Sequence, residues 1–156
     1  MQTTPRILTE LQIALTDELT ALDLYTPHQG KAEAWGYGVF VTYIAERTDD
    51  ERKHIQRLIK RICELGGTPD TTARNPIPEP AADLITGLHQ DRLAEIGAIA
   101  KYNHAIQIAT EDGDNATRAM LEEILKDEDD HLLDIERRLV QIAQVTAPQW
   151  LSLQIG

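Results

Sequence analysis

Two short segments of the chain carry the same pair of polar residues at the same spacing. The first is Glu51-x-x-His54 and the second is Glu128-x-x-His131. On a helix, a Glu and a His three residues apart project from the same face within about one turn, so both can reach one metal ion. A single Glu-x-x-His is a weak signal because many helical proteins contain one by chance. Two copies are more informative.

The two segments belong to a larger internal duplication with an offset of 77 residues. Each has a further Glu upstream at the same distance, and the same offset relates Tyr25 to Tyr102 and Asp50 to Asp127. One Glu from each of two helices and a Glu-x-x-His from each of two others form the ligand set of di-iron and di-manganese carboxylate four-helix bundles. The candidate ligands are Glu18, Glu51, His54, Glu95, Glu128 and His131.

Apolar residues recur at spacings of three and four around the candidate ligands, as in Leu11, Leu15, Glu18 and Leu22. This period predicts long amphipathic helices whose ligands face the interior of a bundle. We expect helices at about residues 5–33, 34–65, 81–110 and 116–143, and a short fifth helix at 148–155. Pro27 would kink the first helix without ending it. The predicted fold is all-α, a single domain over residues 1–156 forming an up-down four-helix bundle with one long crossover.

Two details of this bundle are open to test. The third helix should repeat the first, with Leu88, Arg92 and Glu95 on its inward face and Arg92 in the place of Leu15. The apolar residues of the tail at 149–155 have little left to cover in a completed bundle. We expect this tail to contact neighbouring subunits, with packing across the end of the bundle as the alternative.

The composition and charge of the chain limit the classes of function that we consider. The net charge is −11 and the pI is near 4.8, which argues against a nucleic-acid surface and suits a protein that attracts cations, although solubility alone explains such a charge. Cys63 is the one cysteine in the sequence, so the chain cannot form an internal disulfide. This is consistent with a reducing compartment. The sequence shows no signal peptide and no apolar run long enough for a membrane span. A cytoplasmic location is expected.

The four glutamates occupy positions where the periodicity calls for Leu or Ile. A buried ion without a partner costs several kcal/mol, and a whole domain is stable by only about 5–15 kcal/mol. Two divalent cations would neutralise four carboxylates. The alternative is a buried network of carboxylates with Arg47 and Arg92, which leaves the two histidines and the duplication unexplained. Carboxylates with one imidazole per metal and no thiolate favour iron or manganese over structural zinc.

The duplication also suggests how the ligands divide. One metal would take Glu18, Glu51 and His54, the other Glu95, Glu128 and His131, and Glu51 and Glu128 could each bridge both. Asp50 and Asp127 are candidate acceptors for the ring N–H of the opposite histidine, or ordinary surface carboxylates. Tyr25 and Tyr102 could hydrogen-bond a ligand carboxylate or donate an electron, or serve only as core tyrosines.

These residues resemble the bacterioferritins over nearly the whole chain. Besides the ligands, the likeness rests on Tyr25, His28, Trp35-Gly36, Leu65-Gly66-Gly67-Thr68-Pro69, Ile124-Leu125-Lys126-Asp127-Glu128 and the ending Trp150-Leu-Ser-Leu-Gln-Ile155. The resemblance implies a subunit of a hollow 24-subunit cage. It also implies a ferroxidase centre that oxidises Fe(II) and feeds a ferric mineral core, with Glu51 and Glu128 bridging and Glu18 and Glu95 as terminal ligands.

One position departs from that family. Bacterioferritins bind haem between paired subunits through a Met directly after the first Glu of the motif, and Arg52 stands there in this chain. The two methionines, Met1 and Met120, do not fit the role. The subunit is therefore expected to bind no haem on its own, while a mixed cage with a second, Met-bearing subunit stays open.

We expect the site to carry out redox chemistry at two non-haem iron ions, with O2 or H2O2 as the oxidant. Manganese is the alternative to iron. The oxidised iron would either move on as mineral or stay as a cofactor. Three alternatives are a di-iron or di-manganese oxidase or peroxidase without storage, a DNA-protecting miniferritin, and a metal-stabilised assembly subunit without turnover. A miniferritin shares its ligands between subunits, whereas this chain holds a full set. No nucleic acid or membrane partner is expected.

Overall fold

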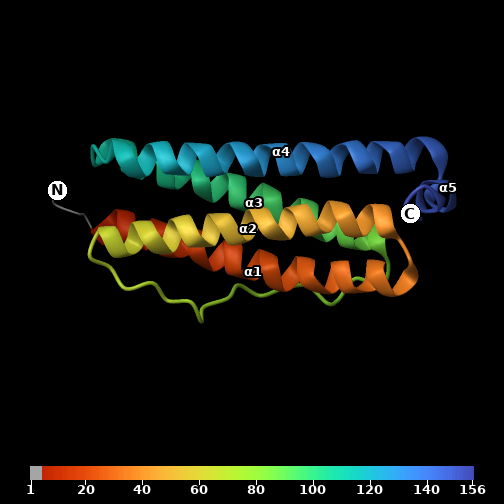
Figure 1. The fold of residues 1–156 in the computed structure, drawn as a ribbon. Coiled ribbons are helices and arrows are strands. Elements are labelled where there is room, and N and C mark those ends of the chain that lie inside the picture. The colour runs from red at the N-terminus through yellow and green to blue at the C-terminus, as the bar shows by residue number, and fades with distance from the viewer. Residues whose placement is uncertain (1–4) are drawn as a thin grey trace.

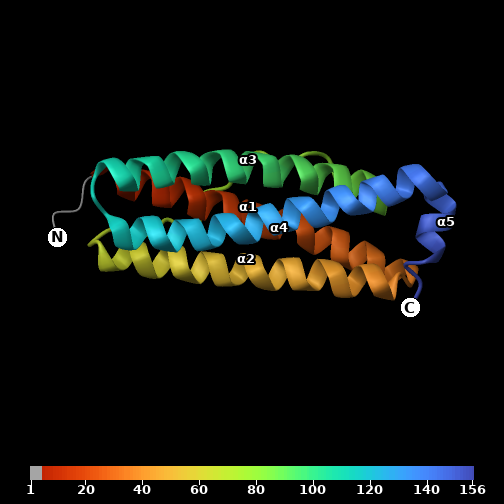
Figure 2. The same cartoon turned by 90° about the horizontal axis from the view of Figure 1, so that it is seen from above.

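The computed structural model describes residues 5–156, and residues 1–4 lie outside the described part. The described chain contains five helices: α1 (Pro5–Trp35), α2 (Gly38–Glu64), α3 (Leu84–Glu111), α4 (Asn115–Val145) and α5 (Ala147–Ser152). Four long helices pack side by side along one axis and α5 lies across one end (Figures 1 and 2). The predicted all-α four-helix bundle with a short fifth helix is confirmed.

The long connection between α2 and α3 runs back along the length of the bundle (Figure 1). As a result α2 and α3 point in the same direction, while α1 with α2 and α3 with α4 form antiparallel pairs. The crossover is tied to α1 along its path: Gln12 exchanges two hydrogen bonds of 2.8 Å with the backbone of Asp70, and Arg74 pairs with Asp23 at 2.7 Å. No described helix combines the length and the apolar character that a membrane span requires.

The helix boundaries differ from the prediction where capping chemistry decides them. The second helix begins at Gly38 instead of residue 34, because Gly36 adopts a φ of 79°, which glycine tolerates and other residues resist. The third helix begins at Leu84 instead of residue 81, because the Asp83 side chain accepts the backbone N–H of Thr86 at 2.8 Å. The first helix continues through Pro27, as predicted, and ends at Trp35 instead of about residue 33.

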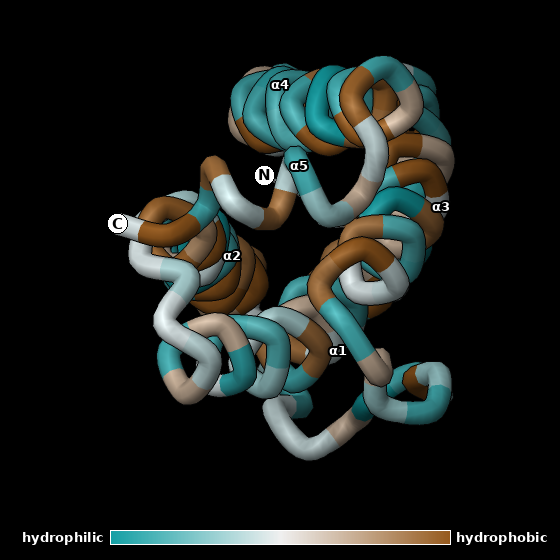
Figure 3. The backbone as a smooth tube through the Cα atoms, turned by 90° about the vertical axis from the view of Figure 1, so that its right-hand side faces the viewer, coloured by the Kyte–Doolittle hydropathy of each residue, from teal (hydrophilic) through white to brown (hydrophobic). Residues whose placement is uncertain are grey.

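The apolar core forms two clusters with the candidate ligands between them. One cluster includes Leu11 and Leu15 of α1 with Leu58 of α2, and the other includes Tyr25 of α1 with Leu88 of α3. Along each long helix the ligands fall between residues of the two clusters. Seen from the α5 end, hydrophobic stretches of the helices turn toward the bundle interior (Figure 3). The polar layer is therefore enclosed by apolar packing on both sides.

The inward face of α3 differs from the sequence prediction in its first half. Arg92 does not lie in the core; its guanidinium pairs with Glu136 on α4 at 2.8 Å, and both side chains are partly exposed. The residue buried beside it is Asp91, which is 1 % exposed. A long, permanently charged side chain is more stable at the rim of the bundle, where it reaches both water and a carboxylate.

The short helix α5 closes one end of the bundle, which was the alternative to a contact between subunits. Trp150 is 1 % exposed and packs edge-on against Phe40 with ring centres 6.2 Å apart. The backbone N–H of Val39 donates to the carbonyl of Gln154 at 3.0 Å, which fastens the tail to the start of α2. Leu153 and Ile155 remain exposed.

Replacing Trp150 with Ala is expected to lower the free energy of unfolding by about 3–5 kcal/mol, because a large buried ring is lost and leaves a cavity. The matched control is Trp35→Ala, because Trp35 is 48 % exposed. That change should stay within about 0.5 kcal/mol of wild type. Denaturant unfolding followed by circular dichroism measures both. Equal losses in the two variants would contradict the role given to α5.

Candidate metal centre

Four helices each contribute to one buried polar cluster at the middle of the bundle. Glu18 comes from α1, Glu51 and His54 from α2, Glu95 from α3, and Glu128 and His131 from α4. All six side chains are between 1 % and 2 % exposed. The six ligands predicted from the duplication therefore lie together in space, although 113 residues separate the first from the last.

The cluster divides into two overlapping groups of four. In each group, one ligand atom per residue lies within 4.8 Å of the others. The first group is Glu18, Glu51, His54 and Glu128, and the second is Glu51, Glu95, Glu128 and His131. Glu51 and Glu128 belong to both groups, which is the arrangement needed for carboxylates that bridge two ions.

The atoms that face the centre of the cluster have no hydrogen-bond partner within the described chain. They are both carboxylate oxygens of Glu51, one of Glu128, and the Nδ1 atoms of His54 and His131. His54 Nδ1 lies only 2.8 Å from Glu128 Oε1, but the two do not form a properly directed hydrogen bond. Buried polar atoms are nearly always paired, so this concentration of unpaired donors and acceptors fits a pair of metal ions.

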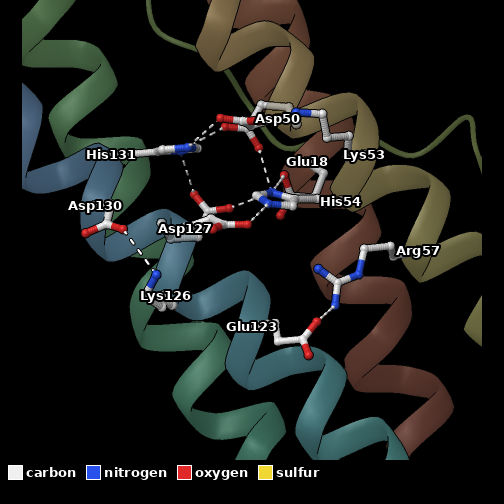
Figure 4. Close-up of polar contacts among 12 residues, drawn as sticks. Glu18, Asp50, Lys53, His54, Arg57, Glu123, Lys126, Asp127, Asp130 and His131 are labelled. Atoms are coloured by element: carbon white, nitrogen blue, oxygen red, sulfur yellow. Dashed lines mark hydrogen bonds and ion pairs between the residues drawn. The ribbon is translucent and has the colours of Figure 1, made fainter.

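The outer nitrogen of each imidazole faces an aspartate on the opposite helix (Figure 4). His54 Nε2 lies 3.2 Å from Asp127 Oδ2, and His131 Nε2 lies 3.5 Å from Asp50 Oδ2. An acceptor at Nε2 fixes the tautomer and leaves the Nδ1 lone pair free to bind a metal. Burial raises the pKa of Asp50, but the hydrogen bond and charge of Lys53, together with the charges of His131 and Arg47, outweigh it and hold the pKa below its ordinary value.

Two tyrosines hydrogen-bond the glutamates that belong to only one of the two ligand groups. Tyr25 on α1 donates its hydroxyl to Glu95 on α3 at 2.5 Å, and Tyr102 on α3 donates in return to Glu18 on α1. Both hydroxyls are fully buried, and burial raises the pKa of each phenol well above its ordinary value. Each tyrosine is therefore a hydrogen-bond donor at neutral pH, and each fixes the direction of one carboxylate.

Without a metal, the site shares its protons unevenly among the carboxylates. Burial, followed by the charge of Glu51, raises the pKa of Glu18 well above its usual range. Burial likewise raises the pKa of Glu95 to about 7. For Glu128, burial and the charge of Glu18 raise the pKa, but the nearby side chains of His131, His54 and Glu95 together outweigh them and lower it.

Both imidazoles are held in the protonated form by the surrounding carboxylates. Burial alone would lower their pKa, but Glu128 and its neighbours outweigh burial. The pKa of His131 rises to about 12, and the pKa of His54 also rises. The metal-free site is thus stabilised by protons, and a metal ion must displace them.

The structure does not support the alternative of an arginine network. Throughout residues 5–156, no Lys or Arg forms an ion pair with any of the four buried glutamates. The guanidinium of Arg47 lies 5.9 Å from the ring centre of Tyr43, and Arg92 pairs with Glu136. Arg52 on α2 is exposed and pairs with Asp49 at 2.7 Å.

One buried pair next to the cluster was not predicted. His28 on α1 lies 2.9 Å from Asp91 on α3, with both side chains at most 5 % exposed. Burial raises the pKa of Asp91 to about 6, while His28 acts in the opposite direction. The duplication gives no signal for this pair. In the 77-residue repeat, His28 corresponds to Ala105 and Asp91 corresponds to Ala14. Only its position one turn from Tyr25 and Glu95 could have suggested it.

Four carboxylates and two imidazoles gathered from four helices match the ligand pattern of ferritin-like four-helix bundles. Comparison with known proteins agrees: a family model of the ferritin-like domain matches residues 8–145. The chain is 30 % identical over 157 residues to a bacterial ferritin of Synechocystis sp., which covers 100 % of both chains. It is 31 % identical to a bacterial ferritin of Paramagnetospirillum magnetotacticum, over 96 % of this chain and 92 % of the relative. A bacterioferritin of Mycobacterium leprae is 30 % identical, over 93 % of this chain and 91 % of the relative. The chain belongs to the ferritin family.

Anaerobic binding of a divalent metal is expected to release roughly two to four protons per chain at pH 7, because raised pKa values leave both imidazoles and part of the carboxylates protonated. Metal affinity should therefore increase with pH. An indicator dye in weakly buffered solution measures the release during Co(II) titration. His89→Ala, at an exposed histidine, should release as many protons as wild type. Binding without proton release would contradict the electrostatic description.

Proposed function

We propose that this chain is an iron storage and detoxification protein that acts as a ferroxidase. In this proposal Fe(II) is the substrate, and two ions bind in the buried cluster before oxidation. The observation that carries it is the pair of overlapping ligand groups that share Glu51 and Glu128. The relatives named bacterial ferritin and bacterioferritin match along nearly their whole length, which supports iron as the metal and storage as its fate.

Each proposed ligand has a distinct role. Glu18 with His54 and Glu95 with His131 would each serve one ion, and Glu51 and Glu128 would bridge the two. Two ions carry four positive charges, which neutralise four carboxylates once the protons have left. Beyond the ligands, Tyr25 and Tyr102 orient the terminal carboxylates, and Asp50 and Asp127 orient the imidazoles.

The reaction is a transfer of two electrons to the oxidant. Each Fe(II) gives up one electron, and O2 with two protons becomes H2O2, or H2O2 with two protons becomes two water molecules. The protein fixes the two ions close together and leaves positions open for the oxidant. Tyr25, which hydrogen-bonds a proposed ligand, is the candidate for an additional electron donor.

For storage we propose that the subunits assemble into a hollow homo-oligomer, a 24-subunit cage, in the cytoplasm. The exposed Leu153 and Ile155 beside α5 are apolar surface available for a contact between subunits. Haem is not part of the proposal for this chain alone, because Arg52 stands at the ligand position. A mixed cage with a haem-binding subunit would supply it from the partner.

A second candidate is a di-iron or di-manganese oxidase or peroxidase that protects against oxidative stress without storing mineral. The observation in its favour is an open cavity that reaches the carboxylates, as small-molecule enzymes have. Iron uptake separates the two functions. A storage protein continues to take up Fe beyond about two per chain in a large assembly, whereas the enzyme stops there.

Glu18→Ala and His131→Ala are each expected to slow rapid Fe(II) oxidation by about a hundredfold or more, because each removes a ligand of one ion. The matched control is Glu33→Ala, at an exposed position on α1, which should oxidise Fe(II) like wild type. Stopped-flow absorbance after mixing with aerated buffer measures the rate, and circular dichroism checks the fold. Rapid oxidation at the wild-type rate in either ligand variant would contradict the assignment.

Thermal melting distinguishes a ferroxidase from an assembly subunit that uses metal only for stability. Saturating Co(II), at about 100 times its dissociation constant, should stabilise the wild-type chain by about 2.7 kcal/mol for each bound ion in either case. Only the ferroxidase should also consume oxygen when Fe(II) is added. Stabilisation without oxygen consumption would contradict the proposed activity, and the absence of stabilisation would contradict the metal site.

A further inference from the structure

A cavity of about 370 Å³ connects the surface of the bundle with the carboxylate cluster. It lies between α1, α3 and residues 75–78 of the crossover. All four buried glutamates, Glu18, Glu51, Glu95 and Glu128, contribute to its lining, whereas neither His54 nor His131 does. The cluster therefore has two different sides. Its carboxylate side faces the cavity, and its imidazole side faces Asp50 and Asp127 on α2 and α4 (Figure 4).

Small side chains create this space. Ala94, Gly97 and Ala98 line the cavity from α3, and Ala21 lines it from α1. A Cβ atom added to Gly97 would meet no other atom within 4 Å. Glycine inside a helix costs about 0.5–1 kcal/mol relative to alanine, so helix stability gives no reason for Gly97.

The outer wall presents mostly apolar surface, and the two charged residues that also line the cavity away from the glutamates, Asp17 and Lys101, pair with each other at 2.6 Å. Pro76 and Pro78 have no backbone N–H that would need a partner, and Ile77 between them is apolar. The backbone N–H of Asn75 donates to Thr20 Oγ1 at 3.0 Å, which fastens this wall to α1. The cavity is thus a feature held in place by specific contacts.

We propose that this cavity admits dioxygen to the metal-loaded cluster, and that Fe(II) reaches the ligands from another side. This inference rests on the proposed ferroxidase function. Dioxygen is neutral and apolar, so it can pass the apolar walls that lead to the carboxylates without losing hydrogen bonds. A hydrated dication loses much of its hydration between apolar walls, at a large cost in free energy. The acidic side with Asp50 and Asp127, which are 30 % and 47 % exposed, suits a cation better.

Gly97→Leu tests the route, because the longer side chain has room to extend beside a stripe of cavity-lining residues on α3. Gly30→Leu is the matched control: Gly30 is helical and exposed, a Cβ there also meets nothing within 4 Å, and it does not line the cavity. Both changes replace a helical glycine with a better helix former.

The protein is loaded with two Fe(II) per chain without oxygen and then mixed with increasing concentrations of O2. In Gly97→Leu the rate constant per unit O2 concentration should fall about tenfold or more. The rate and stoichiometry of anaerobic Co(II) binding should not change. Gly30→Leu should match wild type in every measurement.

Three results would overturn the inference. An unchanged dependence on O2 in Gly97→Leu would show that the cavity is not the oxidant route. An equal slowing of Co(II) binding would make the cavity the route of the metal instead. Failure of the wild-type protein to bind about two Co(II) per chain would contradict the proposed function, and with it this inference.

A measurement on the wild-type protein keeps the inference testable if Gly97→Leu does not fold. Xenon binds in dry apolar cavities. In crystals pressurised with xenon, an atom should occupy the cavity beside Gly97, next to the carboxylate cluster. Ordered water throughout the cavity, with no xenon, would contradict an apolar oxidant route.

Discussion

The burial of four carboxylates and two imidazoles in the core is the constraint on which the rest of this structure depends. Within the described chain, no Lys or Arg neutralises the carboxylates. In the absence of metal their charge is balanced by protons on His54 and His131 and by hydrogen bonds from two tyrosines. Several atoms at the centre still lack a partner. A pair of divalent cations would satisfy these atoms and the charge together.

The fold holds this polar layer by enclosing it between two apolar clusters. Helix α5 closes one end with Trp150, and the crossover covers the flank where the cavity approaches the carboxylates. The two sides of the cluster differ in chemistry, since one meets small apolar side chains and the other meets aspartates. A rigid bundle with two such sides can receive an ion and an oxidant by separate routes.

Much of the fold and the cluster could be predicted from the sequence because the duplication and the helical period act together. A Glu-x-x-His and a Glu repeated at a fixed offset specify six positions, and the period turns them inward. Other features depend on information that the pattern lacks. The turn at Gly36 follows from a positive φ, Arg92 reaches the rim because its side chain is long, and His28 with Asp91 has no counterpart in the repeat. The cavity arises only when the crossover packs over small residues of α1 and α3.

Anomalous diffraction from crystals soaked with Fe(II) without oxygen tests the central claim most directly, because it locates each ion. Two iron peaks are expected inside every subunit, both within bonding distance of Glu51 and Glu128. One peak should also contact Glu18 and His54, and the other Glu95 and His131. A single peak, or iron bound only at the surface while the buried cluster stays metal-free, would contradict it.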